Sequence, residues 1–141
     1  MSAKAFFDTN IFVYARDARD PRKQRIAADL ITKHGTSRTG VISYQVVQEI
    51  FNVLFVKASK KISHVDAQIL LETVLRPLLS VHSSTILFSE AIHLQQRYRL
   101  SWYDSLIVAA AQQANCDILY SEDLQHGQQF GAVTVRNPFL P

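Results

Sequence analysis

The stretch Ala5-Phe6-Phe7-Asp8-Thr9-Asn10 places a carboxylate directly after a short apolar segment near the beginning of the chain. The apolar residues predict a buried strand over residues 4–7, and a short helix is predicted over residues 11–15. In open α/β sheets, ligands bind beyond the carboxyl ends of the strands. Asp8 is therefore a candidate functional residue, and its structural alternative is a cap on the helix that follows.

The rest of the chain continues this alternation of short apolar segments with longer amphipathic ones. Helices are predicted over residues 20–33, 43–57, 63–77, 84–98 and from 101 onward, with His34-Gly35 and Pro77 ending two of them. Further strands are predicted at residues 40–42, 78–82, 117–120 and 133–135. Strands that alternate with helices favour parallel pairing. The predicted fold class is therefore α/β, a three-layer sandwich with a central parallel sheet flanked by helices, in a single domain over residues 1–141.

Three further acids occupy comparable places in the sequence. Glu49 lies within the apolar stretch 46–51, Asp104 opens a helix, and Asp123 follows the strand predicted at 117–120. Carboxylates gathered at one edge of a sheet repel one another unless a cation lies between them. Because oxygen ligands suit hard divalent cations, the four acids together indicate a site for such a metal ion.

Two of these acids also have an ordinary structural explanation. Glu49 could form an ion pair with an arginine such as Arg16 or Arg25, since an unpaired buried carboxylate is costly. Asp104 could serve only to cap its own helix, because helix N-termini favour negative charge.

The fourth acid is the hardest to assign, because Glu122 stands beside Asp123 in the same turn and acids in such turns are usually solvated. Ser121 favours Asp123, since its hydroxyl comes straight after the strand and two residues before that carboxylate. Thr9 and Asn10 follow the first acid directly, and their side chains are expected to orient it or the water ligands of a metal by hydrogen bonding. These three polar residues are the predicted supporting residues of the site.

The distribution of charge suits a polyanionic substrate. Residues 1–61 hold 11 of the 15 Lys and Arg residues but only 5 of the 12 Asp and Glu residues. Such a basic half attracts phosphate groups, although an ordinary soluble surface would also produce this pattern. The candidates for phosphate contacts are the Lys and Arg residues of the helix from Pro21 to Lys33, with Lys57, Lys60 and Lys61.

Other features narrow the class of protein. The single cysteine, Cys116, cannot form an internal disulfide and is expected to be a buried thiol. The five histidines lack paired ligand spacing, which argues against zinc. The chain contains neither a G-x-S-x-G motif nor a Gly-rich phosphate loop. No signal peptide or membrane span is predicted, so a cytoplasmic location is expected.

Taken together, four stretches of the chain resemble the PIN-domain family: Phe6–Asn10, Val41–Glu49, Trp102–Ala111 and Leu119–Gly127. Their order, spacing and flanking residues are similar to the family over almost the whole chain, and most of all to the VapC-type toxins of toxin–antitoxin pairs. The resemblance implies a ribonuclease that cuts RNA internally and depends on Mg²⁺ or Mn²⁺. It also implies an antitoxin protein as partner and a homodimer.

The same resemblance assigns roles to individual residues. The family's quartet of acidic catalytic and metal-binding residues matches four positions of this chain, Asp8, Glu49, Asp104 and Asp123. Thr9 and Ser121 match its supporting hydroxyl positions. We expect Asp8 and Asp104 to bind metal directly, and Glu49 and Asp123 to bind it directly or through water.

Three other functions stay open from the sequence. A PIN nuclease that processes RNA without being a toxin would carry the same residues. A phosphatase or phospho-accepting receiver domain would use Asp8 as nucleophile, but Asn10 stands where such a hydrolase has a second Asp and Arg136 stands near the position of a receiver's Lys. A protein-interaction module would use only the basic and apolar surface.

Overall fold

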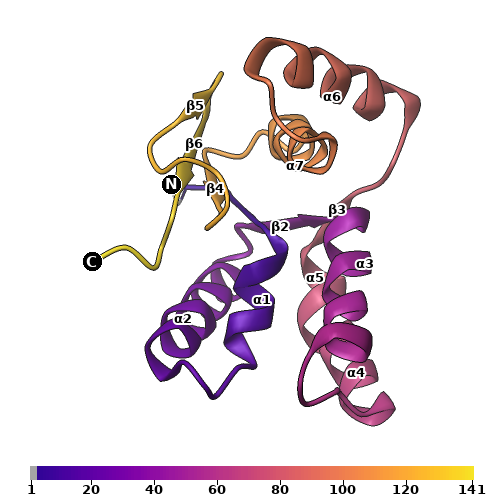
Figure 1. Ribbon diagram of the computed structural model, residues 1–141, viewed down its shortest axis with the longest axis vertical. Helices are drawn as coiled ribbons and strands as arrows, with labels where there is room; N and C mark the ends of the chain where they lie inside the picture. The colour runs from indigo at the N-terminus through magenta and orange to yellow at the C-terminus, as the bar shows by residue number, and fades with distance from the viewer. Residues whose placement is uncertain (1–2) are drawn as a thin grey trace.

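The computed structural model describes residues 3–141, in which a six-stranded sheet has helices on both faces (Figure 1). The strands are β1 (Ala5–Phe7), β2 (Gly40–Ser43), β3 (Leu79–Val81), β4 (Ile118–Tyr120), β5 (Gln129–Phe130) and β6 (Val133–Arg136). They lie in the order β3-β2-β1-β4-β6-β5, and all neighbouring strands are parallel except β5 and β6. The predicted α/β class with a central, mostly parallel sheet is therefore confirmed.

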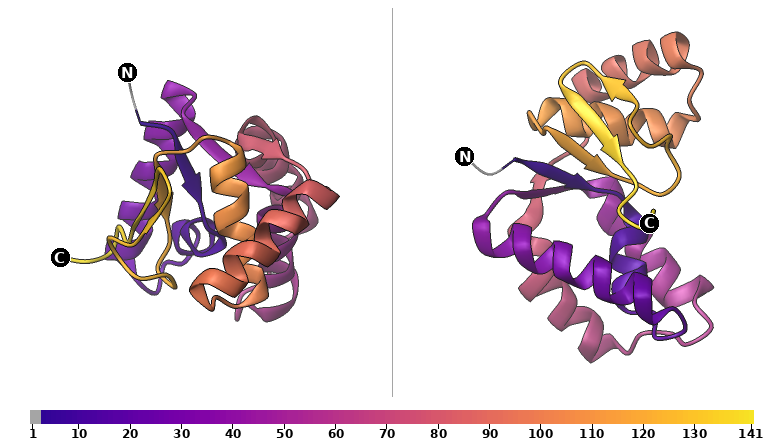
Figure 2. Two further views of the ribbon diagram at one scale, coloured as in Figure 1. Left: turned by 90° about the horizontal axis from the view of Figure 1, so that it is seen from above. Right: turned by 90° about the vertical axis from the view of Figure 1, so that its left-hand side faces the viewer.

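The helices form the two outer layers of the sandwich (Figures 1 and 2). On one side lie α1 (Thr9–Ala15), α2 (Pro21–Ser37), α3 (Tyr44–Asn52) and α4 (His64–Leu70), and on the other lie α6 (Thr85–Tyr98) and α7 (Trp102–Gln113). Two π-helical stretches, η1 (Val53–Lys57) and η2 (Leu71–Leu75), extend α3 and α4, and α5 (Arg76–Leu78) leads into β3. In Figure 1, α1 and α2 form a first arm below the sheet, and α3 and α4 form a second arm.

The central strand β1 anchors the core because it pairs with β2 on one side and with β4 on the other. Its three residues, Ala5–Phe7, have no exposed surface. The Phe7 ring stacks on Tyr120 of β4 with the ring centroids 5.6 Å apart, and it meets the Phe12 ring of α1 edge-on at 5.8 Å. Full burial of a large apolar side chain stabilises a fold by about 1.5–3 kcal/mol. This packing fixes the point at which Asp8 leaves the sheet.

Polar caps begin the helices at the positions that the sequence predicts. The Asp20 side chain accepts a hydrogen bond from the backbone N–H of Lys23, and Pro21 follows it as the first helical residue. Ser63, Ser84 and Ser101 cap α4, α6 and α7 in the same way. Each such cap stabilises its helix by about 1 kcal/mol.

One predicted helix end is wrong, and one strand was missed. α2 does not end at His34-Gly35 but continues to Ser37, and Arg38 ends it by taking a left-handed conformation with φ of 58°. A helix tolerates one internal glycine at a cost of about 1 kcal/mol. The helical segment that begins at His64 runs through η2 and α5 to Leu78, one residue past Pro77, so the predicted limit at Pro77 holds within one residue. β5 was not predicted, because two residues are too few to show a periodic pattern.

Two further expectations concern the thiol and the membrane. Cys116 is buried as predicted, and burial raises the pKa of its thiol to about 11. A thiol with so high a pKa is protonated at neutral pH and is a poor nucleophile. In the part of the chain that the structure describes, no helix has both the length and the apolar character required to cross a bilayer.

Gly40, the first residue of β2, allows a test of the packing between the sheet and the helices. A Cβ atom at Gly40 would lie 2.8 Å from Leu78 Cδ2 and 3.1 Å from Phe7 Cε2. We expect Gly40→Ala to lower the free energy of unfolding by about 1–3 kcal/mol, because overpacking forces neighbours in a filled core to shift. Gly35→Ala is the matched control, since a Cβ atom there meets nothing within 4 Å. Urea denaturation measures both variants, and equal losses of stability would contradict the packing described.

Candidate active site

Asp8 lies where β1 ends and α1 begins. Its backbone N–H donates to the carbonyl oxygen of Tyr120 at 3.0 Å, which continues the β1–β4 pairing by one residue. Only 6% of Asp8 is exposed. Its Oδ1 accepts from the backbone N–H of Thr9 at 2.7 Å, and its Oδ2 accepts from Ser121 Oγ at 2.8 Å. The parallel register thus places the first acid beside the polar residue that follows β4.

The surroundings of Asp8 disfavour its ionised form. Burial raises the pKa of Asp8 to about 6, and the nearby charges of Asp123 and Glu49 add to the rise. The hydrogen bonds from Ser121 and Thr9 act in the opposite direction but are outweighed. A cation beside Asp8 would favour the ionised carboxylate and reduce its repulsion with the other acids.

Glu49 projects from α3 toward α1 and is held by two neutral groups. Thr9 Oγ1 donates to Glu49 Oε2 at 2.6 Å, and Gln45 Nε2 donates to Glu49 Oε1 at 2.7 Å. No ion pair involves Glu49 within residues 3–141, so the predicted alternative of an ion pair with Arg16 or Arg25 is wrong. The hydroxyl of Thr9 therefore orients the second acid, while its backbone N–H binds the first.

Asp123 faces the same region from the turn after β4. Asn10 Nδ2 donates to Asp123 Oδ2 at 3.2 Å, and the backbone N–H of Asp123 donates to Ser121 Oγ at 3.2 Å. The pKa of Asp123 is raised, first by partial burial and then by the charges of Asp104, Glu122 and Glu49. Asn10 was expected to orient the first acid or a metal-bound water, and it contacts the fourth acid instead.

Asp104 lies in the first turn of α7, on the opposite side of the sheet from α1 and α3. Its backbone N–H donates to Ser101 Oγ at 3.1 Å, as the predicted capping spacing requires. The Asp104 side chain makes no hydrogen bond within residues 3–141, so its carboxylate is not used as a cap. Its charge acts on Asp123, which brings the third acid into the same electrostatic group as the other three.

Glu122 points away from this group, although it is adjacent to Asp123 in sequence. Its two carboxylate oxygens accept hydrogen bonds from Tyr14 Oη and Lys23 Nζ. Partial burial opposes ionisation of Glu122, but these hydrogen bonds outweigh it and lower its pKa. Lys23 Nζ also lies 4.5 Å from the centre of the Tyr14 ring. Glu122 therefore forms a structural ion pair with Lys23. Asp123 is the acid of this turn that lies near the other acids of the group.

The four carboxylates do not form a ready-made cage for a metal ion. Within residues 3–141, no three His, Cys, Asp or Glu side chains are close enough together to hold one. The donor set is nevertheless suited to a hard cation, since it consists of carboxylate oxygens with supporting hydroxyl and amide groups. The raised pKa of the buried Asp8 carboxylate shows that a positive charge would be favoured there.

Comparison with protein families identifies the class of this protein. The sequence matches the model of the PIN domain over residues 5–128. The chain therefore belongs to the PIN domain family, which confirms the resemblance found in its sequence. Comparison with curated proteins gives no significant match.

Several solved structures share the fold over nearly the whole chain. A structure of FitAB bound to a DNA fragment superimposes with a TM-score of 0.71 at 18% identity, covering 97% of this chain and 96% of the other. A toxin–antitoxin complex from Klebsiella pneumoniae gives a TM-score of 0.67 at 20% identity, with 96% and 98% covered. VapC20 from Mycobacterium tuberculosis, a toxin that cleaves the sarcin–ricin loop, gives 0.61 at 20% identity, with 85% and 90% covered. At these identities the similarity establishes the fold.

One residue of the candidate site was not predicted from the sequence. Gln45 Nε2 binds Glu49 and also donates to the carbonyl oxygen of Tyr103 at 3.3 Å, which joins α3 to the start of α7. Its spacing of four residues before Glu49 on one helix face was an available signal. Tyr14 and Lys23 hold Glu122 outside the group of acids; Lys23 was a predicted candidate for phosphate contacts, and its ion pair with Glu122 was not predicted.

The Asp8 carboxyl makes the stability of the fold depend on pH. The folded-state pKa of about 6 lies above the ordinary value of 3.8, so the folded state binds the proton more tightly. The resulting destabilisation is absent well below pH 4, grows as the pH rises from about 4 to 6, and is complete above about pH 6, where it is on the order of 1–3 kcal/mol. In chelator, we expect Asp8→Asn to be more stable than the wild type at pH 7 and to lose this advantage toward pH 4.

Thermal unfolding over this pH range, with Asp29→Asn as an exposed control, measures the effect. Addition of Mg²⁺ should stabilise the wild type and reduce the difference between it and Asp8→Asn. A difference that stays constant between pH 4 and pH 7 would show that Asp8 ionises normally in the folded protein.

Proposed function

We propose that this protein is a metal-dependent endoribonuclease and the toxin of a toxin–antitoxin pair. The observation that supports this most directly is the buried Asp8 carboxylate, which lies within an electrostatic group of four acids at the carboxyl end of the central strands. Membership of the PIN domain family agrees with a nuclease. Among proteins of the same fold, VapC20 is a toxin that cleaves RNA, which supports the choice of RNA as substrate.

The proposed metal ligands are Asp8, Asp104, Glu49 and Asp123, and the ion is Mg²⁺ or Mn²⁺. When bound, such an ion lowers the pKa of a coordinated water and neutralises charge on the phosphate under attack. The chain's own residues supply position. Ser121 and the backbone of Thr9 fix both oxygens of Asp8, and Thr9 Oγ1 with Gln45 fixes those of Glu49.

Asp104 and Asp123 complete the proposed site from its opposite side. Asn10 holds one oxygen of Asp123, which leaves the other oxygen for a ligand or for the proton of an attacking water. The raised pKa of Asp123 favours such proton acceptance. Asp104, whose carboxylate makes no hydrogen bond in the described chain, is free to approach a metal.

The proposed partner is an antitoxin protein that covers the acids, and the proposed assembly is a homodimer. Support for the antitoxin comes from the Klebsiella pneumoniae structure of the same fold, which is a toxin–antitoxin complex. A cytoplasmic location follows from this proposal, because the RNA substrates and the antitoxin are made there. We also propose that residues 1–141 form a single domain.

Cleavage of a mixed panel of structured RNAs tests the proposed activity. Purified wild type should cut in Mg²⁺ or Mn²⁺ and not in chelator, and Asp8→Asn and Asp104→Asn should both abolish the cuts. Asp29→Asn, an exposed acid on α2, is the control and should cut normally. Absence of both metal binding and cleavage in the wild type would overturn the proposal and favour a protein-interaction module.

Glu122 and Asp123 provide a matched pair that separates catalysis from structure. We expect Asp123→Asn to lower metal-dependent cleavage by at least about 10-fold, because the loss of even a residue that only orients a metal ligand usually costs about 10–100-fold. We expect Glu122→Gln to leave cleavage within a few-fold of the wild type, because its carboxylate is held by Lys23 and Tyr14 outside the group of acids. Its effect is instead a loss of stability of up to about 1 kcal/mol, as for a partly exposed ion pair.

Single-turnover cleavage and thermal unfolding of the two variants give the comparison. Loss of cleavage in Glu122→Gln with normal cleavage in Asp123→Asn would reverse the two assignments.

A further inference from the structure

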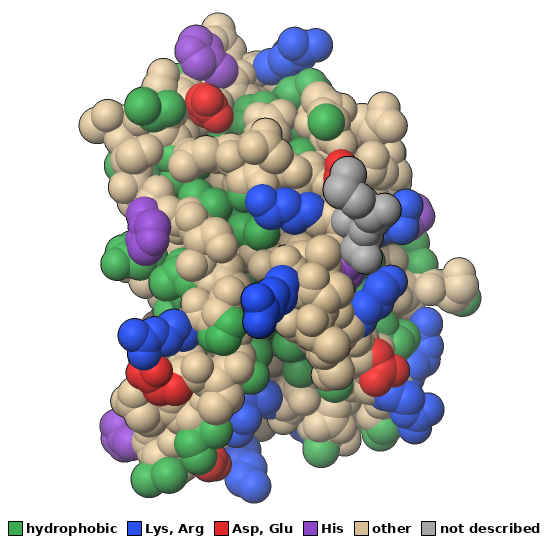
Figure 3. Space-filling model, turned by 180° about the vertical axis from the view of Figure 1, so that it is seen from behind, with side chains coloured by type: hydrophobic (Ala, Val, Ile, Leu, Met, Phe, Trp, Pro, Cys, Tyr) green, Lys and Arg blue, Asp and Glu red, His purple; other side chains and the backbone are tan. Residues whose placement is uncertain are grey.

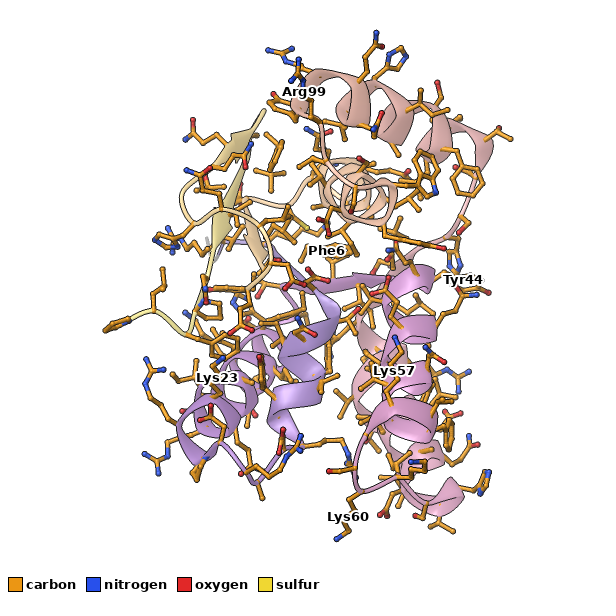
Figure 4. All side chains as sticks on the ribbon, in the orientation of Figure 1. Phe6, Lys23, Tyr44, Lys57, Lys60 and Arg99 are labelled. Atoms are coloured by element: carbon orange, nitrogen blue, oxygen red, sulfur yellow. The ribbon has the colours of Figure 1, made fainter. Side chains whose placement is uncertain are left out.

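A basic cleft opens between the two arms, away from the acids. Its walls are the connection from α1 to α2 on the first arm, and η1 with the loop that follows it on the second arm. The cleft has a volume of about 680 Å³. Five cationic side chains line it, Arg16, Arg19, Lys57, Lys60 and Lys61, against two acids, Asp17 and Asp66. In Figure 4, Lys60 lies at the lower end of the gap between the arms, and Lys57 lies above it on the second arm.

Most of the positive charge in this cleft is available to a ligand. Asp17 is occupied by Arg19, whose Nε lies 2.9 Å from Asp17 Oδ1. The other cations of the cleft form no ion pair within residues 3–141. Lys61 Nζ donates to the carbonyl oxygen of Ala58 at 3.1 Å, and an ammonium group has two further donors. The back of the molecule also shows more Lys and Arg over its lower part, where the arms lie (Figure 3).

Two helices connect this cleft directly to the acids. α1 begins beside Asp8 and ends at Arg16, and α3 with η1 carries Glu49 and ends at Lys57. Each pair is separated by eight residues of helix, which corresponds to about 12 Å at 1.5 Å per residue. A stacked nucleic-acid strand rises by about 3.4 Å per nucleotide, so the cleft lies about three to four nucleotides from the acids.

We propose that this cleft binds the sugar–phosphate backbone of the RNA strand on one side of the bond that is cut. The proposal rests on the proposed ribonuclease function and adds a second contact region to it. Arg16 and Lys57 lie at the ends of α1 and of α3 with η1 that are far from Asp8 and Glu49, so a polyanion that runs along the surface of these helices from the acids reaches both cations. An acidic protein segment would also be attracted by these cations, but its binding would not depend on where the cations lie relative to Asp8 and Glu49.

The neighbouring cations do not share this arrangement. The Lys and Arg residues of α2 were equally good candidates for phosphate contacts from the sequence. Lys23 is bound to Glu122, and Arg25 and Lys33 are exposed but do not line the cleft. The structure therefore separates two groups of cations that the sequence could not distinguish.

Binding of RNA to a non-cleaving protein tests the proposal. In the Asp8→Asn background and in chelator, Lys57→Gln/Lys60→Gln is compared with the control Arg25→Gln/Lys33→Gln, which removes the same charge elsewhere. The probe is a single-stranded RNA of about 16 nucleotides, the upper end of common site sizes. Affinity is measured over a series of NaCl concentrations, and circular dichroism checks that each variant folds.

We expect the cleft variant to bind about tenfold more weakly and to reduce the slope of log K against log salt by roughly 1.4, since each lost single-strand phosphate contact contributes about 0.7. In the control variant, both the RNA affinity and the slope of log K against log salt should stay close to those of the parent Asp8→Asn protein. Equal losses in the two variants would overturn the proposal, because the cations would then act only through net charge. Unchanged RNA binding in the cleft variant, with weakened binding of a polyglutamate peptide, would instead assign the cleft to an acidic protein.

Cleavage of the same RNA separates this proposal from the proposed function. If the wild type cuts and the cleft variant cuts and binds as well as the control variant, the nuclease stands and the cleft proposal fails. If the wild type neither binds nor cuts any RNA of the panel, the proposed function fails and the cleft proposal fails with it.

Discussion

Burial of the Asp8 carboxylate is costly, and the surrounding segments are arranged to reduce that cost. The carboxylate lies at the end of a strand with no exposed surface, so it cannot be solvated freely. Its two oxygens instead accept from the backbone of Thr9 and from Ser121, and the pairing of β1 with β4 brings these donors together. These bonds do not fully compensate, since the pKa remains raised. The remaining penalty is what a bound cation would relieve.

Glu49 and Asp123 are held by side chains from other segments, and a further contact reaches the helix that carries Asp104. Thr9 connects α1 to Glu49 on α3, and Gln45 connects α3 to the start of α7 through Tyr103. Asn10 connects α1 to the turn after β4. Removing one acid therefore changes the partners of the others, and the effects of two substitutions within the group should not add.

The sequence predicted the class of fold, because the fold class depends on short local patterns. Apolar runs located five of the six strands, and residues such as Asp20-Pro21 and Ser101 located the helix starts. Helix ends were less predictable, since the end of α2 depends on the left-handed conformation of Arg38. The strand β5 is too short to leave a periodic signal.

Within the candidate site, the sequence supplied the candidate residues but did not predict which of them bind one another. Thr9 and Asn10 were expected beside the first acid, yet their side chains contact Glu49 and Asp123. That outcome depends on how α1 packs against α3 and on how the turn after β4 folds back. The different contacts of Glu122 and Asp123 also depend on Lys23 and Tyr14, which lie about a hundred positions earlier in the chain.

The pairing of β1 with β4 has a consequence for the order in which the protein folds during synthesis. Three contacts, Lys4 with Asp117, Asp8 with Ser121 and Asn10 with Asp123, each join residues 113 positions apart. Contacts of such long sequence separation form late and slowly. When the chain leaves the ribosome from its N-terminus, the edge of β1 that pairs with β4 stays unpaired until residues near 120 have emerged. The group of acids is therefore complete only after Asp123 has emerged, and a chain interrupted before that point lacks the contacts of Asp8 with Ser121 and of Asn10 with Asp123.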